Sequence, residues 1–494
     1  MVSLKKFVKS KIVCTLGPAT ESEQMIKALI DAGMSVCRLN FSHGTHENHA
    51  EIYNRIRKIS NQVAVLCDIQ GPKIRIGDME EPVTLVPEDK IKITTKDLVG
   101  NKDIISISHK GFLNDIEPGD YVYINDGLVK LVVEEVNKPE EFARCEVLLG
   151  GRISDRKGVN IPSGRLSTKN PTDKDVKDLK FIAALNPEYV AASFVSNAEE
   201  VGRVRRILAN EGCPDIKIIS KIERPVALEN FDEILEASDG IMVARGDLGV
   251  EIPYNELPLK QKEMIRKCNI NSKPVIVATQ MLESMTHQAR PTRGEVSDVF
   301  NAIFDRSDAV MLSGETSIGE YPVETVKTMR EIIKSAEQNI PRMNPDKLDS
   351  PQQEIYETMG HGIYTISREF KDLNYRGKII AITRGGKSAR MISKYRPDLP
   401  IIGITDNPKT ARQMNLVWGV ETVFSDKLHL VSGNPEEIMR NAMVYLYNNG
   451  YMGRSEHVII SIPSRFCPMR SALIALYYIK DVLDCLPEDV ELTR

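Results

Sequence analysis

Short, uniformly apolar runs alternate with amphipathic segments along most of the chain. The amphipathic segments, such as residues 23–31, 46–60 and 198–210, carry apolar side chains at helical spacing. The apolar runs lie at residues 12–16, 36–39, 63–67, 189–194, 216–221, 240–244, 275–279 and 309–312. Strands that are apolar throughout and alternate with helices are typical of a parallel sheet covered on both faces. Eight such strands close a (β/α)8 TIM barrel, which we predict here; an open doubly wound sheet is the alternative.

Two parts of the chain have a different pattern. Between the third and fourth runs, residues 90–95, 120–125, 128–136 and 145–149 have the alternation or composition of short β-strands. After a Pro-rich, polar stretch at 339–353, an amphipathic helix and apolar runs at 378–382, 401–404 and 457–460 indicate a separate α/β unit. We therefore expect the barrel in residues 1–70 and 165–340, an inserted small β-barrel domain in 71–164, and a C-terminal α/β domain in 354–494.

The composition is that of an ordinary globular protein and excludes several classes of function. With 494 residues, 41% hydrophobic and 27% charged, the chain can form two or three cores. A net charge of −4 gives no support to nucleic-acid or membrane-surface binding. The eight cysteines form no CxxC pair, which favours a reducing compartment. No apolar run is typical of a signal peptide or a transmembrane helix, so we expect a cytoplasmic protein without a membrane or nucleic-acid partner.

Polar or flexible residues follow the carboxyl ends of most predicted barrel strands. In a barrel, side chains at these positions point into one shared mouth. The mouth is expected to contain Arg38, Asn40, Ser42, His43, Asp68, Lys73, Arg75, Lys221, Glu223, Gly246, Asp247, Thr279 and Glu315.

Two carboxylates in this set, Glu223 and Asp247, follow neighbouring strands. Mg²⁺ is usually held by one or two carboxylates together with substrate oxygens and water. An ion pair with Arg245 or Lys221 is the alternative for either acid alone. Their position on adjacent strand ends favours a metal site.

Three cations, Arg38, Arg75 and Lys221, are expected beside this pair. Surface cations are usually solvated or paired with an acid, but convergence on a metal site suits a phosphorylated substrate better. Gly246 allows close backbone approach, and a helical turn at 247–249 would present N–H groups to a carboxylate. The residues thus predict a Mg²⁺-dependent enzyme that acts on a small phosphorylated acid.

Strings in a fixed order resemble the pyruvate kinase family over nearly the whole chain. They are KIVCTLGPAT, RLNFSHG, GPKIRIG, INDGLVKL, RKGVNIP, SKIE, VARGDLGVEIP, ATQMLESM and RPTRGEVSDVFNAIFDRSDAVMLSGETSIGEYP. The resemblance implies transfer of the phosphoryl group of phosphoenolpyruvate to ADP, giving pyruvate and ATP in the last step of glycolysis. It also implies a homotetramer, and it implies that the inserted domain is a mobile lid that excludes water.

The resemblance further implies a role for each matching residue. Glu223 and Asp247 would hold Mg²⁺ or Mn²⁺, and Lys221 would stabilise the moving phosphoryl group. Gly246, Asp247 and Thr279 would bind the substrate acid, with Thr279 on the proton route to the enolate and water as the final donor. Arg38 would bridge phosphates. The nucleotide would meet Asn40, His43, Arg75 and Lys174.

One departure concerns the monovalent cation. Family members that need K⁺ hold it at positions matching Asn40, Ser42, Asp68 and the carbonyl of Ile69, and carry an acid where this chain has Lys73. A fixed ammonium can supply the positive charge that the ion brings. We therefore expect that K⁺ is not required; a lysine that merely points to solvent is the alternative.

The C-terminal domain contains a candidate phosphate loop between an apolar run and a helix. Its residues are Thr383, Arg384, Gly385, Gly386, Lys387 and Ser388. Amides, hydroxyls and cations at a helix start suit a phosphate, although Ala381 stands where a Walker A loop requires glycine. The loop resembles the family's effector site for a sugar phosphate or AMP. Residues 461–467 do not match the family's glycine-rich effector loop. A C-terminal domain that is unregulated or differently regulated is therefore the alternative.

Two other functions are compatible with parts of this pattern. A carbon–carbon lyase built on a barrel would also use Mg²⁺ held by Glu and Asp. The lid and the cations Lys221 and Arg75 favour nucleotide phosphoryl transfer over this reading. A catalytically silent metabolite sensor would keep only the C-terminal phosphate loop. In this chain the expected polar residues of the barrel mouth are also present, which argues against a sensor.

Overall fold

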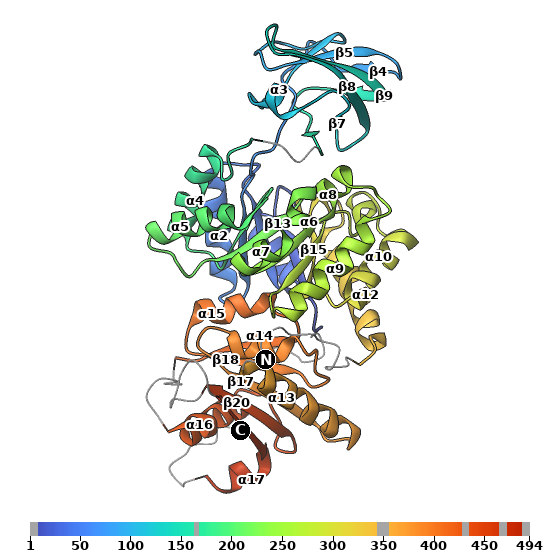
Figure 1. Cartoon of the computed structure of the whole chain (residues 1–494). Helices are drawn as coiled ribbons and strands as arrows, with labels where there is room; N and C mark the ends of the chain where they lie inside the picture. The colour runs from blue at the N-terminus through green and yellow to red at the C-terminus, as the bar shows by residue number, and fades with distance from the viewer. Residues whose placement is uncertain (1–7, 163–166, 343–354, 427–433, 464–471, 487–494) are drawn as a thin grey trace.

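A computed structural model describes residues 8–162, 167–342, 355–426, 434–463 and 472–486. The chain forms three parts in a row, with the β domain at one end, the barrel in the middle and the C-terminal domain at the other end (Figure 1). The boundaries expected at residues 164 and 354 lie outside the described ranges. Within those ranges, we find no helix with both the length and the apolar character needed to cross a bilayer.

Eight parallel strands close into a barrel in the order β1-β16-β15-β14-β13-β12-β3-β2. This closure confirms the predicted TIM barrel and excludes the open sheet. The strands are β1 (Lys11–Thr15), β2 (Val36–Asn40), β3 (Ala64–Asp68), β12 (Tyr189–Ala192), β13 (Lys217–Ile222), β14 (Gly240–Ala244), β15 (Val275–Ala278) and β16 (Ala309–Leu312).

The barrel strands are apolar throughout because both of their faces are covered. Alternate side chains, including Val36, Leu66 and Met242, fill the interior, and their neighbours pack against the outer helices. Those helices are α1 (Glu23–Ala32), α2 (His46–Ile59), α4 (Asp173–Leu185), α5 (Ala198–Asn210), α7 (Phe231–Ala237), α9 (Leu257–Ile270), α10 (Arg293–Phe304) and α12 (Pro322–Asn339).

Several of these helices begin at a side-chain cap. Thr172 and Thr292 form capping boxes with Asp175 and Glu295, in which each threonine oxygen accepts from a backbone N–H three residues on. Shorter helices follow strands at the barrel mouth: α6 (Pro225–Glu229), α8 (Arg245–Glu251) and α11 (Gly314–Ser317). These turns set the direction of the polar residues after each strand.

The inserted β domain has its own apolar core, which includes Phe112, Leu131 and Ile153. Its larger sheet has the order β11-β7-β8-β9-β5-β6, and a two-stranded sheet pairs β10 with β4. The elements are β4 (Val83–Leu85), β5 (Lys90–Thr94), β6 (Ile104–Ser106), α3 (Phe112–Asp115), β7 (Tyr121–Ile124), β8 (Val129–Asn137), β9 (Phe142–Leu149), β10 (Gly151–Ile153) and β11 (Val159–Asn160).

The C-terminal domain is a five-stranded sheet in the order β19-β18-β17-β20-β21. The prediction found β17 (Gly377–Ile382), β18 (Ile401–Thr405) and β20 (His457–Pro463) but not β19 (Val420–Phe424) or the antiparallel β21 (Ala472–Tyr478). Its helices are α13 (Ile355–Asp372), α14 (Lys387–Ser393), α15 (Pro408–Gln413), α16 (Pro435–Asn448) and α17 (Ile479–Asp484).

Buried ion pairs join the C-terminal domain to the amino-terminal end of the barrel. Arg396 Nη1 lies 2.9 Å from Asp308 Oδ1, and Arg412 Nε lies 2.6 Å from Glu188 Oε1. Removing one partner of such a pair leaves an uncompensated buried charge. These pairs therefore help to hold the C-terminal domain against the barrel.

Candidate active site

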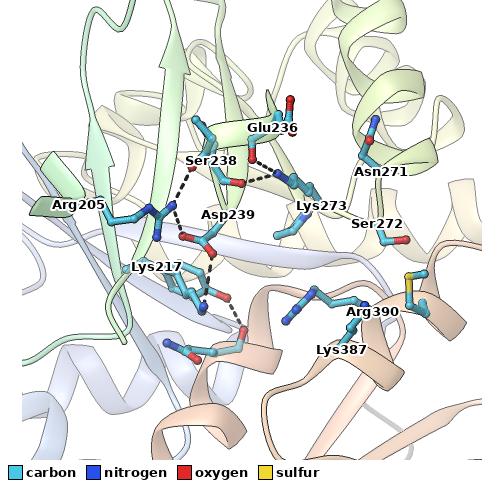
Figure 2. A pocket seen from close by; sticks show the side chains of 15 residues that line it. Arg205, Lys217, Glu236, Ser238, Asp239, Asn271, Ser272, Lys273, Lys387 and Arg390 are labelled. Carbon is cyan, nitrogen blue, oxygen red and sulfur yellow. Dashed lines mark hydrogen bonds and ion pairs between the residues drawn. The ribbon is translucent and has the colours of Figure 1, made fainter. Parts of the chain in front are cut away.

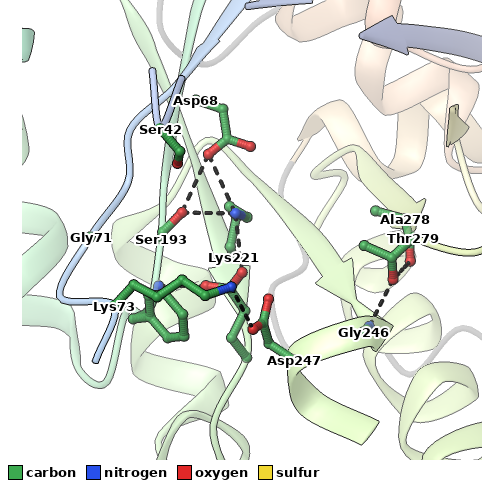
Figure 3. Close-up of polar contacts among 12 residues, drawn as sticks. Ser42, Asp68, Gly71, Lys73, Ser193, Lys221, Gly246, Asp247, Ala278 and Thr279 are labelled. Atoms are coloured by element: carbon green, nitrogen blue, oxygen red, sulfur yellow. Dashed lines mark hydrogen bonds and ion pairs between the residues drawn. The ribbon is translucent and has the colours of Figure 1, made fainter. Parts of the chain in front are cut away.

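The carboxyl ends of the barrel strands enclose a polar cavity of about 160 Å³. Most of the predicted residues meet there: the lining includes Arg38, Asn40, Ser42, His43, Lys73, Arg75, Lys221, Glu223, Asp247 and Thr279. Asp68 and Gly246 lie just behind this lining in contact with it (Figure 3). Glu315 does not reach it, because its carboxylate accepts from the backbone N–H groups of Leu282 and Ser313.

Lys221 is the most tightly surrounded cation of the cavity. Its Nζ lies 3.0 Å from Glu223 Oε1 and 3.3 Å from Asp68 Oδ1, and it donates to Ser193 Oγ at 2.7 Å (Figure 3). Burial disfavours the charged form, but Asp68 and Glu223 outweigh burial and raise the pKa of Lys221 above its ordinary value. The ammonium is therefore charged and fixed in position.

Asp247 lies close enough to Glu223 for its charge to act on the Glu223 carboxyl. Glu223 is 1% exposed, and its Oε2 accepts from the backbone N–H of Phe194 at 2.6 Å. Burial raises the pKa of Glu223 and the Asp247 charge adds to this, while Lys221 opposes it. A divalent cation would relieve this repulsion, and the two acids are the hard oxygen donors that Mg²⁺ prefers.

The described residues contain no group of three or more His, Cys, Asp and Glu side chains that would hold a metal ion. A site of two carboxylates leaves the remaining positions of an octahedral ion to substrate oxygens and water. Glu223 and Asp247 thus fit a metal that is completed by the substrate.

Asp68 connects two cations of the cavity. Its Oδ2 accepts from Arg38 Nε at 2.7 Å, and Arg38 Nη1 donates to Thr15 Oγ1 at 2.9 Å. Burial would raise the pKa of Asp68, but Lys221 and Arg38 outweigh it and lower the pKa below the ordinary value. Asp68 therefore remains ionised and orients Arg38 and Lys221 together.

Three of the positions expected to hold a monovalent cation have protein partners. Asp68 accepts from Arg38, the carbonyl of Ile69 accepts from Ser193 Oγ at 2.7 Å, and Asn40 Oδ1 accepts from the N–H of Ser42 at 3.1 Å. Lys73 lies across the cavity, with its Nζ 3.5 Å from Asp247 Oδ1. Lys73 does not simply point to solvent.

Thr279 directly follows β15 and has a backbone φ of 71°, in the left-handed region that a β-branched residue rarely adopts. Its Oγ1 donates to the carbonyl of Ala278 at 2.6 Å and accepts from the N–H of Gly246 at 2.7 Å. The Gly246 N–H is thus directed at Thr279. This turn places the threonine hydroxyl against the cavity.

The residues expected to meet the nucleotide do not all share one surface. Arg75 lines the mouth and also a second cavity of about 430 Å³ beneath the β domain, next to Arg156 and Lys157. Lys174 lines neither cavity. Its Nζ donates to the carbonyl of Phe41 at 2.8 Å and to Asp178 Oδ2 at 2.7 Å.

Ser193 is a site residue that the prediction missed. It bonds to Lys221, Asp68 and the carbonyl of Ile69. The expected fourth strand, 189–194, ends instead at Ala192, and the chain turns at Phe194, whose φ is 54°. A strand end placed two residues earlier would have identified Ser193 by the rule that found the other residues.

A second unpredicted contact joins the β domain to the barrel. Asn160 Nδ2 donates to Glu251 Oε1 at 3.0 Å. Glu251 is buried on α8, and burial raises its pKa to about 7. An alternating pattern alone does not show which residues of two domains meet, so this pair could not be predicted from the sequence.

The residues of the candidate phosphate loop in the C-terminal domain differ in their exposure to solvent. Arg384, Gly385 and Lys387 are exposed, whereas Thr383, Gly386 and Ser388 are buried. Thr383 Oγ1 accepts from the N–H of Gly386 at 3.0 Å. Of the neighbouring segment at 461–467, residues 464–467 lie outside the described part of the chain.

Comparisons with known proteins match the whole arrangement. The family model described as "Pyruvate kinase, barrel domain" matches residues 7–326, and "Pyruvate kinase, alpha/beta domain" matches 368–466. Pyruvate kinases of Staphylococcus epidermidis (strain ATCC 12228) and Staphylococcus aureus (strain MRSA252) are each 42% identical over 92% of this chain and 77% of their own. A crystal structure of a pyruvate kinase from Cryptosporidium parvum is 37% identical, with a TM-score of 0.86, and covers 95% of this chain and 96% of its own.

Proposed function

Because this chain belongs to the pyruvate kinase family, we propose that its barrel mouth transfers the phosphoryl group of phosphoenolpyruvate to ADP. The bond between phosphorus and the enol oxygen breaks, and a bond forms to a terminal phosphate oxygen of ADP. The enolate left behind takes a proton at its methylene carbon and becomes pyruvate. The observation that carries this proposal is the charged Lys221, fixed 3.0 Å from Glu223 in a cavity lined by further cations.

Lys221 stabilises the charge on the moving phosphoryl group. Phosphoryl transfer needs little covalent help from a protein and depends on positioning and on fixed positive charge. Ser193 and Asp68 hold the ammonium in place, so it does not have to reorganise during the reaction. Arg38, oriented by Asp68, contacts phosphate oxygens from the other side.

Glu223 and Asp247 would hold a divalent cation, Mg²⁺ or Mn²⁺, which would neutralise charge on the substrate oxygens. The raised pKa of Glu223 and the nearness of Asp247 support this role.

Thr279 takes part in moving the proton. Its hydroxyl lies at the cavity wall between the carbonyl of Ala278 and the N–H of Gly246. A hydroxyl that both donates and accepts can pass a proton from water toward the enolate carbon. The backbone N–H of Asp247 binds the carboxylate of the substrate, together with that of Gly246 once it leaves Thr279.

The nucleotide lies between the barrel mouth and the β domain, which acts as a lid. Arg75 lines both cavities there, and Asn40 and His43 line the mouth. Lys174 contacts the nucleotide after its ammonium leaves Asp178. Closure of the lid excludes water and limits hydrolysis of the transferring group.

The enzyme works without K⁺. Lys73 places an ammonium 3.5 Å from Asp247, and the oxygens of Asp68 and Ile69 already accept from protein donors. A fixed charge on Lys73 replaces the charge that the ion supplies in relatives with an acid at this position.

The C-terminal domain regulates the barrel through the loop at residues 383–388. A phosphorylated metabolite, such as a sugar phosphate or AMP, lowers the phosphoenolpyruvate concentration that gives half-maximal rate. Exposed cations at Arg384 and Lys387 support binding of an anion there. Kinetics that stay flat across a panel of such metabolites would contradict this part of the proposal.

The working form is a homotetramer in the cytoplasm. Leu473, Ile474 and Leu476 leave apolar surface exposed on β21, which lies at an edge of its sheet. A second subunit covers such an edge in many oligomers. Light scattering after gel filtration measures the subunit number directly.

A coupled assay separates the candidate functions. Pyruvate is measured by its reduction with lactate dehydrogenase, with phosphoenolpyruvate present and ADP either present or absent. With phosphoenolpyruvate as the only carbon substrate, a kinase forms pyruvate only when ADP is present, whereas a carbon–carbon lyase and a silent sensor form none. Loss of turnover in Lys221→Met excludes the sensor and assigns the activity to this mouth.

A further inference from the structure

Residues 41–45, which we call the β2–α2 loop, connect β2 to α2 at the barrel mouth. Ser42 and His43 of this loop line the mouth cavity, as does Asn40 at the end of β2. The loop ends at Thr45, the cap of α2, whose side chain accepts from the backbone N–H of Asn48. The direction of this loop therefore decides which groups one side of the mouth presents to a ligand.

His49 holds the β2–α2 loop from behind the mouth. It lies one turn into α2, is 6% exposed and is not part of the cavity lining. Its Nε2 lies 2.8 Å from the carbonyl oxygen of His43. A carbonyl oxygen can only accept a hydrogen bond, so Nε2 carries the proton and donates it.

The surroundings of His49 keep its ring neutral. Its Nδ1 is buried, and within the described part of the chain this atom has no hydrogen-bond partner. A second proton on the ring would create a buried charge whose Nδ1–H has no acceptor. Burial accordingly lowers the pKa of His49 below its ordinary value, although the carbonyl of His43 and the charge of Asp178 oppose this. His49 is therefore a neutral hydrogen-bond donor near neutral pH.

Gly44 leaves room for the histidine to reach the loop. Its φ of 76° lies in the left-handed region, which favours glycine. A Cβ at this position would lie 3.2 Å from Asn48 Oδ1 and 3.4 Å from His49 Nε2. A side chain at residue 44 would thus press on the groups beside the carbonyl of His43, and the glycine permits the close approach of the ring.

Ring stacking fixes the orientation of His49. Its ring stacks on that of Phe41, with 4.2 Å between the centroids and 20° between the planes. Phe41 is a buried residue of the same loop, and its carbonyl accepts from Lys174 Nζ at 2.8 Å. The loop is therefore held at two carbonyls, by α2 through His49 and by α4 through Lys174 (Figure 1).

We propose that His49 is a positioning residue for the nucleotide, because its bond to the carbonyl of His43 fixes the direction of the β2–α2 loop. The proposal rests on the proposed function, in which the nucleotide lies beside Asn40 and His43. It adds a residue outside the mouth that sets the affinity for a nucleoside diphosphate.

The effect of His49 should be confined to the nucleotide. Among the described contacts of His49, none reaches Lys221, Glu223 or Asp247. Without the N–H of His49, the loop has more conformations available before ADP binds, and ordering them on binding costs free energy. The affinity for ADP should therefore fall, whereas phosphoenolpyruvate and the divalent cation should bind as before.

Two substitutions separate the hydrogen bond from the ring stacking. His49→Phe keeps a ring against Phe41 and removes the donor, whereas His49→Gln keeps an N–H donor and removes the ring. His361→Phe, the same change at an exposed histidine of α13, is the matched control. Each full-length protein is titrated calorimetrically with ADP in the presence of Mg²⁺. Initial rates are then measured with ADP and phosphoenolpyruvate varied in turn.

The Kd and the KM for ADP should rise about threefold to tenfold in His49→Phe, the loss expected for one neutral hydrogen bond. The KM for phosphoenolpyruvate and the affinity for Mn²⁺ should stay close to the wild-type values. His49→Gln should recover most of the affinity for ADP. A general loss of structure would instead change all of these quantities together, and circular dichroism establishes that each variant is folded.

An unchanged affinity for ADP in folded His49→Phe would overturn the proposal. An equal rise of the KM for phosphoenolpyruvate, or an equal loss of ADP affinity in His361→Phe, would overturn it as well. If His49→Phe does not fold, Gly44→Ala tests the same contact from the loop, and unchanged ADP affinity in that variant would also overturn the proposal. A wild type that binds ADP but forms no pyruvate would contradict the proposed function instead, because the titration is carried out without turnover.

Discussion

Lys73 and Asp247 face each other across the barrel mouth, with Lys73 Nζ 3.5 Å from Asp247 Oδ1 (Figure 3). Lys73 follows β3 at the start of the β domain, whereas Asp247 lies on α8 of the barrel. One contact therefore adds a positive charge to the mouth and joins the base of the proposed lid to a proposed metal ligand. An acid at residue 73 would instead add a third negative charge beside Glu223 and Asp247.

Lys73→Glu should make the enzyme depend on a monovalent cation. The wild type is expected to have the same initial rate in tetramethylammonium as in K⁺, since Lys73 supplies the charge. The variant should be slow in tetramethylammonium and recover when K⁺ is added. A wild-type rate that rises many-fold with K⁺ would show that Lys73 does not replace the ion.

Asp247→Asn and Glu223→Gln should weaken divalent binding by more than tenfold. Each change removes one charged oxygen ligand and lessens the attraction for the cation. Mn²⁺ binding followed by electron paramagnetic resonance measures this without turnover. Glu320→Gln, a change at an exposed acid outside the cavity, is the matched control. Equal Mn²⁺ affinity in all three variants would place the metal elsewhere.

Thr279→Ala should lower kcat by about a hundredfold, within the range known for a lost proton-transfer group. Thr279→Ser keeps the hydroxyl between Gly246 and Ala278 and should restore most of the rate. The KM for phosphoenolpyruvate should change less than kcat in Thr279→Ala if the hydroxyl moves a proton. A change confined to KM would mean that Thr279 only positions the substrate.

Stability should fall as the pH rises through the titration of Glu251. The pKa of this carboxyl is raised from 4.5 to about 7 in the folded protein, so between these values the unfolded chain loses the proton while the folded chain keeps it. The contribution of Glu251 to the stability of the folded protein is fully present below pH 4.5 and is lost above about pH 7.

Glu251→Gln keeps an acceptor for Asn160 and removes the titration. The free energy of unfolding of Glu251→Gln should exceed that of the wild type by an amount that grows with pH. The difference should be near zero at pH 4.5 and at most about 3 kcal/mol above pH 7, the free energy that corresponds to a pKa shift of this size. Thermal midpoints measured across this pH range show the difference. Parallel curves for the two proteins would indicate that Glu251 does not titrate in this window.

The sequence was most informative where one physical rule applied at many positions. Strands buried on both faces must be apolar throughout, so eight such runs indicated a closed barrel. Residues just past these strands, such as Lys221, Glu223 and Asp247, could then be placed in one mouth. β19 and β21 were missed because β19 contains a half-buried Glu421 and β21 leaves Leu473 and Leu476 exposed at an edge of the sheet.

Contacts between distant segments were beyond this reasoning. Ser193 was hidden by a strand end placed two residues too late, and Asn160 meets Glu251 across a domain boundary that no periodicity describes. The cavity that Figure 2 shows between α14 and the amino-terminal end of the barrel likewise depends on how α14 packs against the barrel. Such pairs follow from the packing of whole domains rather than from local pattern.

A single-turnover experiment tests whether Lys221 stabilises the phosphoryl group in transit. Enzyme in excess is mixed with phosphoenolpyruvate, ADP and Mg²⁺, and ATP is measured after rapid quenching. Lys221→Met should form ATP about 10² to 10³ times more slowly than the wild type while it still binds Mn²⁺. Lys267→Met, a change at a lysine on the outer helix α9, should match the wild type. Formation of ATP by Lys221→Met at the wild-type rate would show that Lys221 does not stabilise the moving phosphoryl group.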